Sequence, residues 1–323
     1  NGSLRAVLHA PMEEYLLGVV PYEMSDSFPL EALKAQAVTA RTYALRKAGS
    51  SGDYDVVDNT NDQAYMGVKA ENKNAARAVE ETKGVCGMYQ GKLAECFYSA
   101  SNGGQTELVH HVWGAGDYGY FQMTDDPYDL ENPESVVMSA TLPKRISNDQ
   151  QLGLMKAALY ASLDEPLSAK GFDLEQPYSI TEIEKITLSD PRFTDSPSRL
   201  YTKAEITVKV KGYQFETEEE ELSIFSLTNA ESTASPNESK SAAPATAAVT
   251  VTLPVFDTLE DALSLSINAT DNELITVRET DTEFVFESRR YGHGVGMSQR
   301  GAQWMASQYG KTYRDILSFY YPG

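Results

Sequence analysis

The chain has 323 residues, enough for one large domain or two ordinary ones. Apolar residues make up 41% and charged residues 23%, which is a globular composition and excludes a disordered or fibrous chain. Asp and Glu number 47 against 27 Lys and Arg, a formal net charge of -20. Because polyanions are bound by clustered Lys and Arg, this balance argues against nucleic acid and acidic lipid as partners and favours a neutral or cationic ligand.

Hydrophobic runs are too short to cross a bilayer, and the longest, residues 16–20, is interrupted by Gly18. There is no basic and apolar leader. The first residues, Asn1-Gly2-Ser3, are typical of what remains after an upstream segment is removed. We therefore expect any membrane attachment to come only through a removed N-terminal anchor.

The first third of the chain is predicted to be mainly helical. Apolar residues recur at helical spacing over 11–21, and a second helix follows the turn at 25–27 and runs to about Lys47. The apolar face of this second helix consists of Leu30, Leu33, Ala37, Ala40 and Ala44. Such small side chains imply close approach of another element. A third helix is expected over 72–83.

A hairpin is predicted over 85–98, with Gln90-Gly91-Lys92 at its tip. A three-residue loop would place Cys86 opposite Cys96, whereas a two-residue loop would shift the register and point the two thiols to different faces. The sequence therefore leaves open both a disulfide and two half-buried thiols.

The character of the chain changes between about 137 and 285. A helix is expected over 149–163, and alternating runs at 201–212 and 213–222, joined at Lys211-Gly212, predict an antiparallel hairpin. Residues 228–250 are rich in Ala, Ser and Thr and have no aromatic residue, which predicts a disordered linker. The chain ends with a predicted helix over 299–309.

Glu23 is the candidate acid. It lies in Val19-Val20-Pro21-Tyr22-Glu23-Met24, where apolar and aromatic neighbours raise a carboxyl pKa towards that of the general acid needed to cleave a glycosidic bond. A helix cap or a surface residue is the alternative. The other nearby acids sit in polar, turn-like surroundings, so none stands out as a second catalytic carboxylate: Asp26, Asp58, Asp62 and Glu107.

The four histidines show no pair with the spacing of a helical zinc site. Cys96 with His110 or His111 would supply only two ligands, so loop histidines with ordinary partners are the favoured interpretation and no metal is predicted. His293 differs, because three glycines and hydrogen-bonding side chains surround it in Gly292-His293-Gly294-Val295-Gly296-Met297-Ser298-Gln299. This is either a ligand-facing segment or a glycine-rich helix entry.

Several motifs in one order closely resemble the stage II sporulation protein D family, which includes the amidase enhancers. They are EYLLGVVPYEM (14–24), LEALKAQAVTARTYA (30–44), DNT (58–60), QAYMG (63–67), SNGGQTE (101–107), VWG (112–114) and GHGVGMSQRGA (292–302). The resemblance covers roughly 11–130 and 286–323. It does not extend to the middle of the chain.

The resemblance implies an extracytoplasmic lytic transglycosylase, anchored to the membrane or secreted to the cell wall. Such an enzyme cleaves the MurNAc-GlcNAc bond of peptidoglycan glycan strands stripped of stem peptides, during engulfment and beside a partner amidase. Glu23 matches the catalytic glutamate of the family. One acid suffices, because it protonates the leaving oxygen and then takes the proton of the sugar's own 6-hydroxyl, giving 1,6-anhydroMurNAc.

The resemblance also bears on metals. In some members a Cys is followed five positions later by a His, and the pair holds zinc. Here Cys96 is followed by Ser101, so a zinc ion would need His110 or His111 as a replacement ligand. No cofactor is therefore expected.

We expect an α+β fold, with a catalytic domain formed by 4–136 and 286–323 and a mainly antiparallel β lobe inserted at 137–285. The predicted groove residues, which would hydrogen-bond or stack on sugars, are Arg41, Gln63, Tyr65, Ser101, Gly104, Thr106, His293, Ser298 and Gln299. A helix-packing ion pair is the alternative for Arg41, and a core aromatic for Tyr65.

Two other functions fit the same groove. The first is a non-catalytic wall-binding enhancer of an N-acetylmuramoyl-L-alanine amidase, which would tolerate Glu23→Gln. The second is a glycoside hydrolase that activates water, which would need a second working carboxylate.

Overall fold

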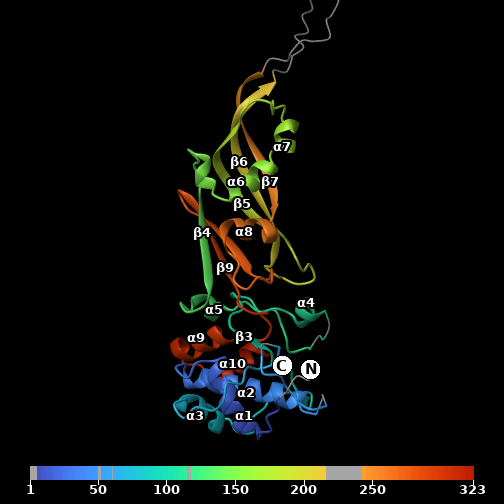
Figure 1. The fold of residues 1–323 in the computed structure, drawn as a ribbon, viewed down its shortest axis with the longest axis vertical. Helices are drawn as coiled ribbons and strands as arrows, with labels where there is room; N and C mark the ends of the chain where they lie inside the picture. The colour runs from blue at the N-terminus through green and yellow to red at the C-terminus, as the bar shows by residue number, and fades with distance from the viewer. Residues whose placement is uncertain (1–5, 50–51, 60, 115, 117, 216–241) are drawn as a thin grey trace, which may run out of the picture.

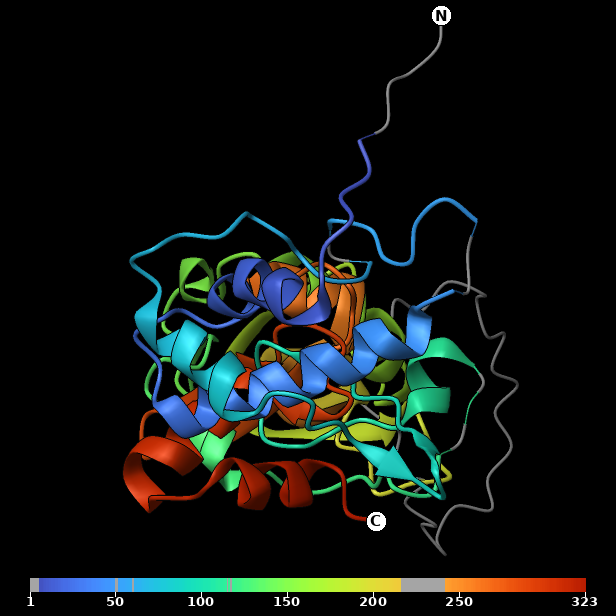
Figure 2. The ribbon, with the colours of Figure 1, turned by 90° about the horizontal axis from the view of Figure 1, so that it is seen from below.

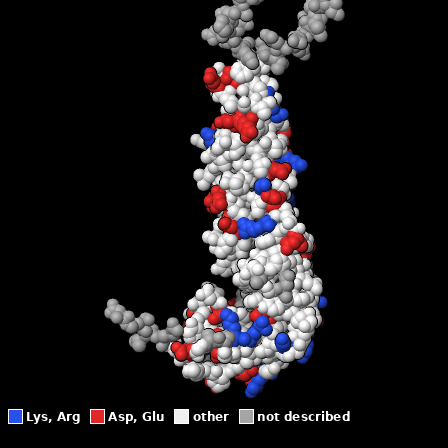
Figure 3. Space-filling model, turned by 90° about the vertical axis from the view of Figure 1, so that its right-hand side faces the viewer, with Lys and Arg blue, Asp and Glu red and all other residues white. Residues whose placement is uncertain are grey.

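The computed structural model describes residues 6–49, 52–59, 61–114, 116, 118–215 and 242–323. The fold is α+β, and Figure 1 shows two parts stacked along the long axis. We call the described residues before Val137 and after Arg289 the basal body, and those between these positions the insert lobe. The insert lobe stands on the basal body as a column, with acidic and basic side chains interspersed over its surface (Figure 3).

The basal body is built around helix α2, which contacts the four other long helices of this part. The helices are α1 (Met12–Glu23), α2 (Leu30–Lys47), α3 (Lys73–Glu81), α9 (Gln299–Tyr309) and α10 (Tyr313–Tyr320). The predicted helices at 11–21, 30–47, 72–83 and 299–309 are confirmed, and α10 was not predicted. Figure 2 shows helices from both ends of the chain side by side in this part.

Small side chains allow this close helix packing. Ala32, Ala35, Ala37 and Ala40 of α2 are fully buried, in one hydrophobic cluster with residues of α1, α3, α9 and α10. An alanine face lets helix axes approach closely and leaves no large side chain to order. The core thus joins the start and the end of the chain.

Short strands complete the basal body. They are β1 (Met88–Tyr89), β2 (Lys92–Leu93), β3 (Tyr98–Ser99) and β10 (Met297–Ser298), with helices α4 (Val109–Trp113) and α5 (Pro127–Glu131) between β3 and the lobe. β3 and β10 pair in parallel, with Tyr98 opposite Met297 and Ser99 opposite Ser298. This pairing brings two distant segments of the chain to one place.

The predicted hairpin forms with a two-residue loop. Met88 pairs with Leu93 and Tyr89 with Lys92, so Gln90-Gly91 is the turn, and both residues have positive φ angles as a tight hairpin requires. Cys86 and Cys96 are free thiols, which settles the question in favour of the two-thiol alternative.

The insert lobe contains two antiparallel three-stranded sheets. One has the order β4 (Val137–Pro143), β9 (Glu283–Arg289), β8 (Leu274–Glu279); the other has the order β5 (Ser179–Pro191), β6 (Tyr201–Phe215), β7 (Ala242–Pro254). The helical elements are η1 (Asp149–Leu152), α6 (Met155–Ala161), α7 (Asp164–Ala169), η2 (Val255–Leu259) and α8 (Glu260–Leu263). Aliphatic residues and phenylalanines of both sheets and these helices form one core.

Two local predictions in the lobe are wrong. Residues 201–215 form one continuous strand, so the predicted turn at Lys211-Gly212 does not exist, and 216–222 lie outside the described residues. Close packing favours glycine at position 212, because a Cβ there would lie 3.0 Å from the Cβ of Tyr178 and 3.2 Å from the Phe172 ring. The predicted helix at 149–163 is interrupted at Gly153, which has a positive φ.

The linker predicted at 228–250 is wrong for 242–250, and 228–241 lie outside the described residues. Residues 242–250 belong to β7, which pairs with β6 in unbroken register. A paired strand needs no aromatic residues, because alternate small and branched side chains, such as Ala245, Ala247 and Val249, pack on the core.

Two separate cores should unfold separately. Leu33 lies in the basal core and Leu159 in the lobe core, and both are fully buried. Each change to alanine should cost about 2–5 kcal/mol of local stability. In calorimetry we expect two transitions, with Leu33→Ala lowering one midpoint and Leu159→Ala the other. A single transition that both variants lower would contradict this prediction.

Candidate active site

Glu23 lies where four segments of the basal body meet. It is the last residue of α1, and Met24 continues in an extended conformation. Its carboxylate accepts hydrogen bonds from the Ala64 amide, at 3.2 Å, and from the side chains of Tyr98 and Gln299. These partners come from the 61–68 segment, from β3 and from α9. Of these four residues, the sequence analysis predicts Glu23 and Gln299 as site residues and does not predict Ala64 or Tyr98.

Burial raises the pKa of Glu23 above its ordinary value. The three hydrogen bonds act in the opposite direction, because they favour the ionised carboxylate, but desolvation is the largest effect. A carboxyl that holds its proton to higher pH can donate it to a leaving group. The sequence analysis predicts a raised pKa for Glu23, and the structure gives one, with burial as the largest cause.

Gln63 fixes the tyrosine that contacts Glu23. The side chain of Gln63 is buried, and its amide donates to the Tyr98 hydroxyl at 3.1 Å and to the Ala40 carbonyl at 3.2 Å. Its Oε1 accepts from the Tyr15 hydroxyl at 3.0 Å. Since the Tyr98 oxygen accepts from Gln63, the single proton of that hydroxyl is available for Glu23. Gln63 does not contact Glu23; it orients the Tyr98 hydroxyl, which in turn hydrogen-bonds Glu23.

Tyr65 covers α1 one turn before Glu23. Its ring lies on Gly18, where a Cβ would come within 2.2 Å of it, and it is parallel to the Tyr15 ring with 5.8 Å between centroids. The ring is only partly buried. Tyr65 therefore packs on α1 with part of its ring and leaves another part exposed, where a sugar could stack.

Gln299 and Ser298 open α9 and have different roles. Gln299 reaches Glu23 and also lies 3.4 Å from the Gln36 side-chain oxygen. Ser298 caps α9 by accepting from the Gly301 amide at 3.0 Å, and its hydroxyl donates to Asp129. The Ser298 side chain is therefore engaged inside the protein.

Arg41 lies in the helix packing, away from Glu23. Its guanidinium pairs with Glu13 at 2.6 Å and donates to the Val85 carbonyl at 3.1 Å. Glu13 and Glu23 are ten residues apart on α1, a distance of about 15 Å along the helix. Of the two roles considered for Arg41, the structure shows the helix-packing ion pair and not a place in the groove.

The predicted groove residues near 101–106 are also buried and engaged. The Ser101 hydroxyl donates to Asp129 at 2.7 Å, and the Thr106 hydroxyl donates to the Gln122 carbonyl at 2.9 Å. Gly104 has a φ of 92°, and a Cβ there would lie 2.4 Å from Leu130. These residues shape the turn and present no free polar group.

His293 supports the strand that carries Tyr98. Its Nδ1 accepts from the Val295 amide at 3.0 Å, and its ring also hydrogen-bonds the backbone of Tyr98. Burial lowers the pKa of His293 to about 4, so the ring is neutral near pH 7. It lies against the rings of Phe97 and Trp113.

Tyr98 and Tyr15 were not predicted as site residues. Both are contacts across the fold, which no local pattern reveals. The available signal was their place in the chain, since Tyr98 lies three residues before the turn at 101 and Tyr15 is the second residue of the first motif.

The segment from Cys96 to Ser101 does not fit a zinc ion. Among the described residues, Cys96 belongs to no group of three or more side chains that could hold a metal ion. The hydroxyl of Ser101 is engaged with Asp129. His110 and His111 instead face Asp195, in a group whose ligand atoms lie within 4.8 Å of one another.

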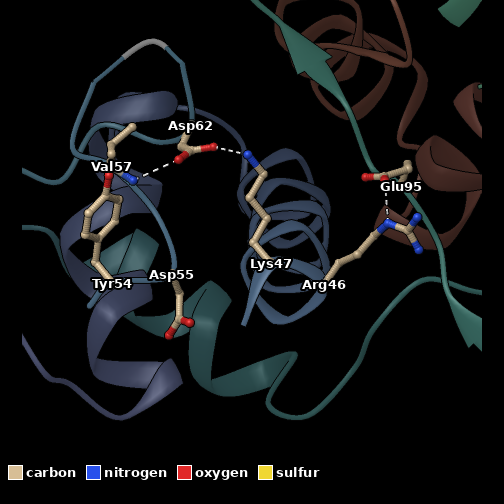
Figure 4. Close-up of a pocket in the computed structure, with 7 residues that line it drawn as sticks. All are labelled: Arg46, Lys47, Tyr54, Asp55, Val57, Asp62 and Glu95. Atoms are coloured by element: carbon tan, nitrogen blue, oxygen red, sulfur yellow. Dashed lines mark hydrogen bonds and ion pairs between the residues drawn. The ribbon is translucent and has the colours of Figure 1, made fainter. Parts of the chain in front are cut away.

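A polar pocket of about 660 Å³ lies in the basal body (Figure 4). It is lined by Arg46, Lys47, Tyr54, Asp55, Val57, Asp62 and Glu95. Asp62 accepts from the Tyr43 hydroxyl at 2.7 Å and from the Val57 amide at 2.8 Å, and it pairs with Lys47. Asp62 is two residues before Ala64, whose amide hydrogen-bonds Glu23, so the Cα atoms of Asp62 and Ala64 lie at most about 7 Å apart.

The chain is similar in sequence to several known proteins. A family model described as stage II sporulation protein (SpoIID) matches residues 1–89. The amidase enhancer of Bacillus subtilis (strain 168) is 33% identical over 320 residues, which are 95% of this chain and 39% of that protein. Stage II sporulation protein D of the same strain is 27% identical over 336 residues, which are 99% of this chain and 75% of that protein.

The structure therefore defines an α+β protein with a buried glutamate at the end of its first helix. By sequence, the chain is similar to proteins of the stage II sporulation protein D family. It spans about two fifths of the amidase enhancer.

The raised pKa of Glu23 predicts a stability cost with a definite pH dependence. Burial disfavours the ionised form in the folded state, so stability falls as pH rises from the ordinary carboxyl pKa through the raised one. Glu23→Gln should therefore unfold at a higher temperature than the wild type at pH 7, and this gain should vanish at pH values below the ordinary carboxyl pKa.

Glu14→Gln is the matched control, since Glu14 lies on the same helix and is exposed. Its effect on the unfolding midpoint should not follow this pH dependence. A gain for Glu23→Gln that persists unchanged at low pH would contradict the prediction.

Proposed function

We propose that this protein is a peptidoglycan lytic transglycosylase that acts on the cell wall during sporulation. The supporting observation is one buried glutamate with a raised pKa, held by a backbone amide, a tyrosine and a glutamine. In the described part of the chain, no carboxylate is among the groups that hydrogen-bond Glu23. This suits an intramolecular reaction, which needs neither a protein nucleophile nor activated water.

The reaction balances around Glu23 alone. The protonated carboxyl gives its proton to the glycosidic oxygen as the bond from C1 of MurNAc to O4 of GlcNAc breaks. The carboxylate then takes the proton of the MurNAc 6-hydroxyl while O6 bonds to C1. The acid is regenerated, the products are a 1,6-anhydroMurNAc end and a free GlcNAc 4-hydroxyl, and no water is consumed.

The contacts of Glu23 suit both halves of this cycle. Burial favours the protonated form, which acts first, while Tyr98 and Gln299 hydrogen-bond the carboxylate that acts second. The ring of Tyr65 offers a stacking face, and the pocket lined by Lys47 and Asp62 offers donors and acceptors for sugar hydroxyls.

We place the activity outside the cytoplasm, at the cell wall, on glycan freed of stem peptides by a partner amidase. The name of the amidase enhancer of Bacillus subtilis supports an amidase partnership. Among the described residues, no helix is long and apolar enough to cross a bilayer.

The same name favours a second candidate, a wall-binding enhancer that cuts no glycan. The two candidates differ at Glu23. A binder has no need of a buried ionisable group and should lose nothing when Glu23 becomes Gln.

The decisive experiment is mass spectrometry of peptide-free glycan after incubation with the wild type, Glu23→Gln and the control Glu14→Gln. We expect 1,6-anhydroMurNAc ends from the wild type and Glu14→Gln, and turnover lowered at least about a hundredfold in Glu23→Gln with glycan affinity unchanged. Reducing ends would indicate hydrolysis. Binding by all three proteins without cleavage would support the enhancer.

Tyr98→Phe should change the pH dependence of this cleavage. The Tyr98 hydroxyl lowers the pKa of Glu23, so its removal raises that pKa further. Because the acid must be protonated, the descending limb of kcat/KM should move to higher pH. Tyr309→Phe, on the exposed side of α9, is the control and should leave the profile in place. A shift of the limb to lower pH would contradict the role of Tyr98.

A further inference from the structure

A cluster of three ligand-type side chains joins the insert lobe to the basal body. His110 and His111 lie on α4, and Asp195 lies on the loop that connects β5 to β6 and descends towards α4 (Figure 1). The Nε2 atoms of His110 and His111 lie 3.0 Å from the two different carboxylate oxygens of Asp195. The three side chains thus converge on one point from two parts of the fold.

The His111 ring is held rigidly in this position. Its Nδ1 lies 2.6 Å from Glu107, and Glu107 is in turn paired with the buried Arg290 at 3.1 Å. Phe193, from the Asp195 loop, stacks on the ring with 3.8 Å between centroids. A carboxylate behind an imidazole is the usual support of a metal-binding histidine, since it fixes the ring and the tautomer.

Both nitrogens of the His111 ring face carboxylates, Nδ1 at 2.6 Å from Glu107 and Nε2 at 3.0 Å from Asp195. In the tautomer that donates from Nδ1 to Glu107, the Nε2 lone pair points towards Asp195. An imidazole nitrogen and a carboxylate oxygen in this arrangement are able to share one metal ion, with Glu107 holding the ring from behind.

The spacing of the ligand atoms suits zinc. Two imidazoles and a carboxylate form a ligand set that zinc accepts, with a fourth position left for water. Ligands bound at about 2.0–2.1 Å in a tetrahedron lie about 3.3 Å apart; the ligand atoms here lie within 4.8 Å of one another, with 3.0 Å between each histidine and its Asp195 oxygen, so small side-chain shifts bring them to one ion. We propose that His110, His111 and Asp195 bind a zinc ion that fastens the insert lobe to the basal body.

This site is distinct from the activity proposed for Glu23. The Asp195 loop is already attached to the basal body, since Arg199 donates to the Gly104 carbonyl at 2.7 Å and to the Gln105 side chain at 3.0 Å. A zinc ion would add a second attachment on the other side of Pro197, whose carbonyl accepts from Gln105. Its role is to hold the loop rather than to act on substrate.

The test is calorimetric titration of the full chain, freed of metal by chelation, with zinc chloride. We expect one zinc ion per chain and a rise in the unfolding midpoint, with Asp195→Asn weakening zinc binding at least about tenfold. Asp195 is exposed, so this variant should fold. Asp190→Asn, at an exposed carboxylate on the preceding strand, and His9→Ala, at an exposed histidine, are matched controls that should bind zinc like the wild type.

Cobalt provides an independent readout, because a tetrahedral nitrogen and oxygen site gives Co²⁺ a strong visible absorption. We expect this band in the wild type and in both controls, and its loss in Asp195→Asn. A wild type that binds no zinc, or an Asp195→Asn variant that binds zinc as tightly as the wild type, would overturn the proposal.

Discussion

Two buried carboxylates on one short helix organise the basal body. Asp129 accepts from the Ser101 hydroxyl, the Asn102 amide and the Ser298 hydroxyl, while Asp126 accepts from the Asn102 side chain at 2.8 Å and the Tyr320 hydroxyl at 2.6 Å. Burial and the neighbouring Asp129 charge raise the pKa of Asp126 to about 6. Charges are buried at a cost, which is offset only when hydrogen bonds satisfy them. This network connects the turn after β3 to the start of α9, and so sets Tyr98 and Gln299 against Glu23.

Glu23 is subject to two opposed influences. Desolvation favours the carboxylic acid, and three hydrogen bonds favour the carboxylate. In the reaction proposed above, in which Glu23 acts first as an acid and then as a base, opposed influences of this kind are an advantage. Each contact comes from a different segment, so the balance depends on the tertiary structure as a whole rather than on α1.

The features that the sequence predicted well have local causes. The helices follow from apolar spacing and caps. A raised pKa of Glu23 is also expected from its apolar neighbours in the chain, but its largest cause is burial in the folded protein. Contacts between distant segments were not predictable in the same way. Tyr98 reaches Glu23 only through the β3–β10 pairing, and Asp195 meets His111 across 84 positions. The turn predicted at Lys211-Gly212 was wrong because the sequence does not distinguish a glycine required by close packing from a glycine required by a turn.

The strands that carry the chain out of and back into the basal body are paired along their whole length, with Val137 opposite Arg289. The points of departure and return are therefore neighbours, like the two ends of a hairpin. Neighbouring points of departure and return are what an inserted segment needs if it is to leave the path of its host chain undisturbed. The lobe is nevertheless joined to the basal body at a second place, where Arg199 contacts Gly104 and Gln105, so the orientation of the column is set by two separate attachments.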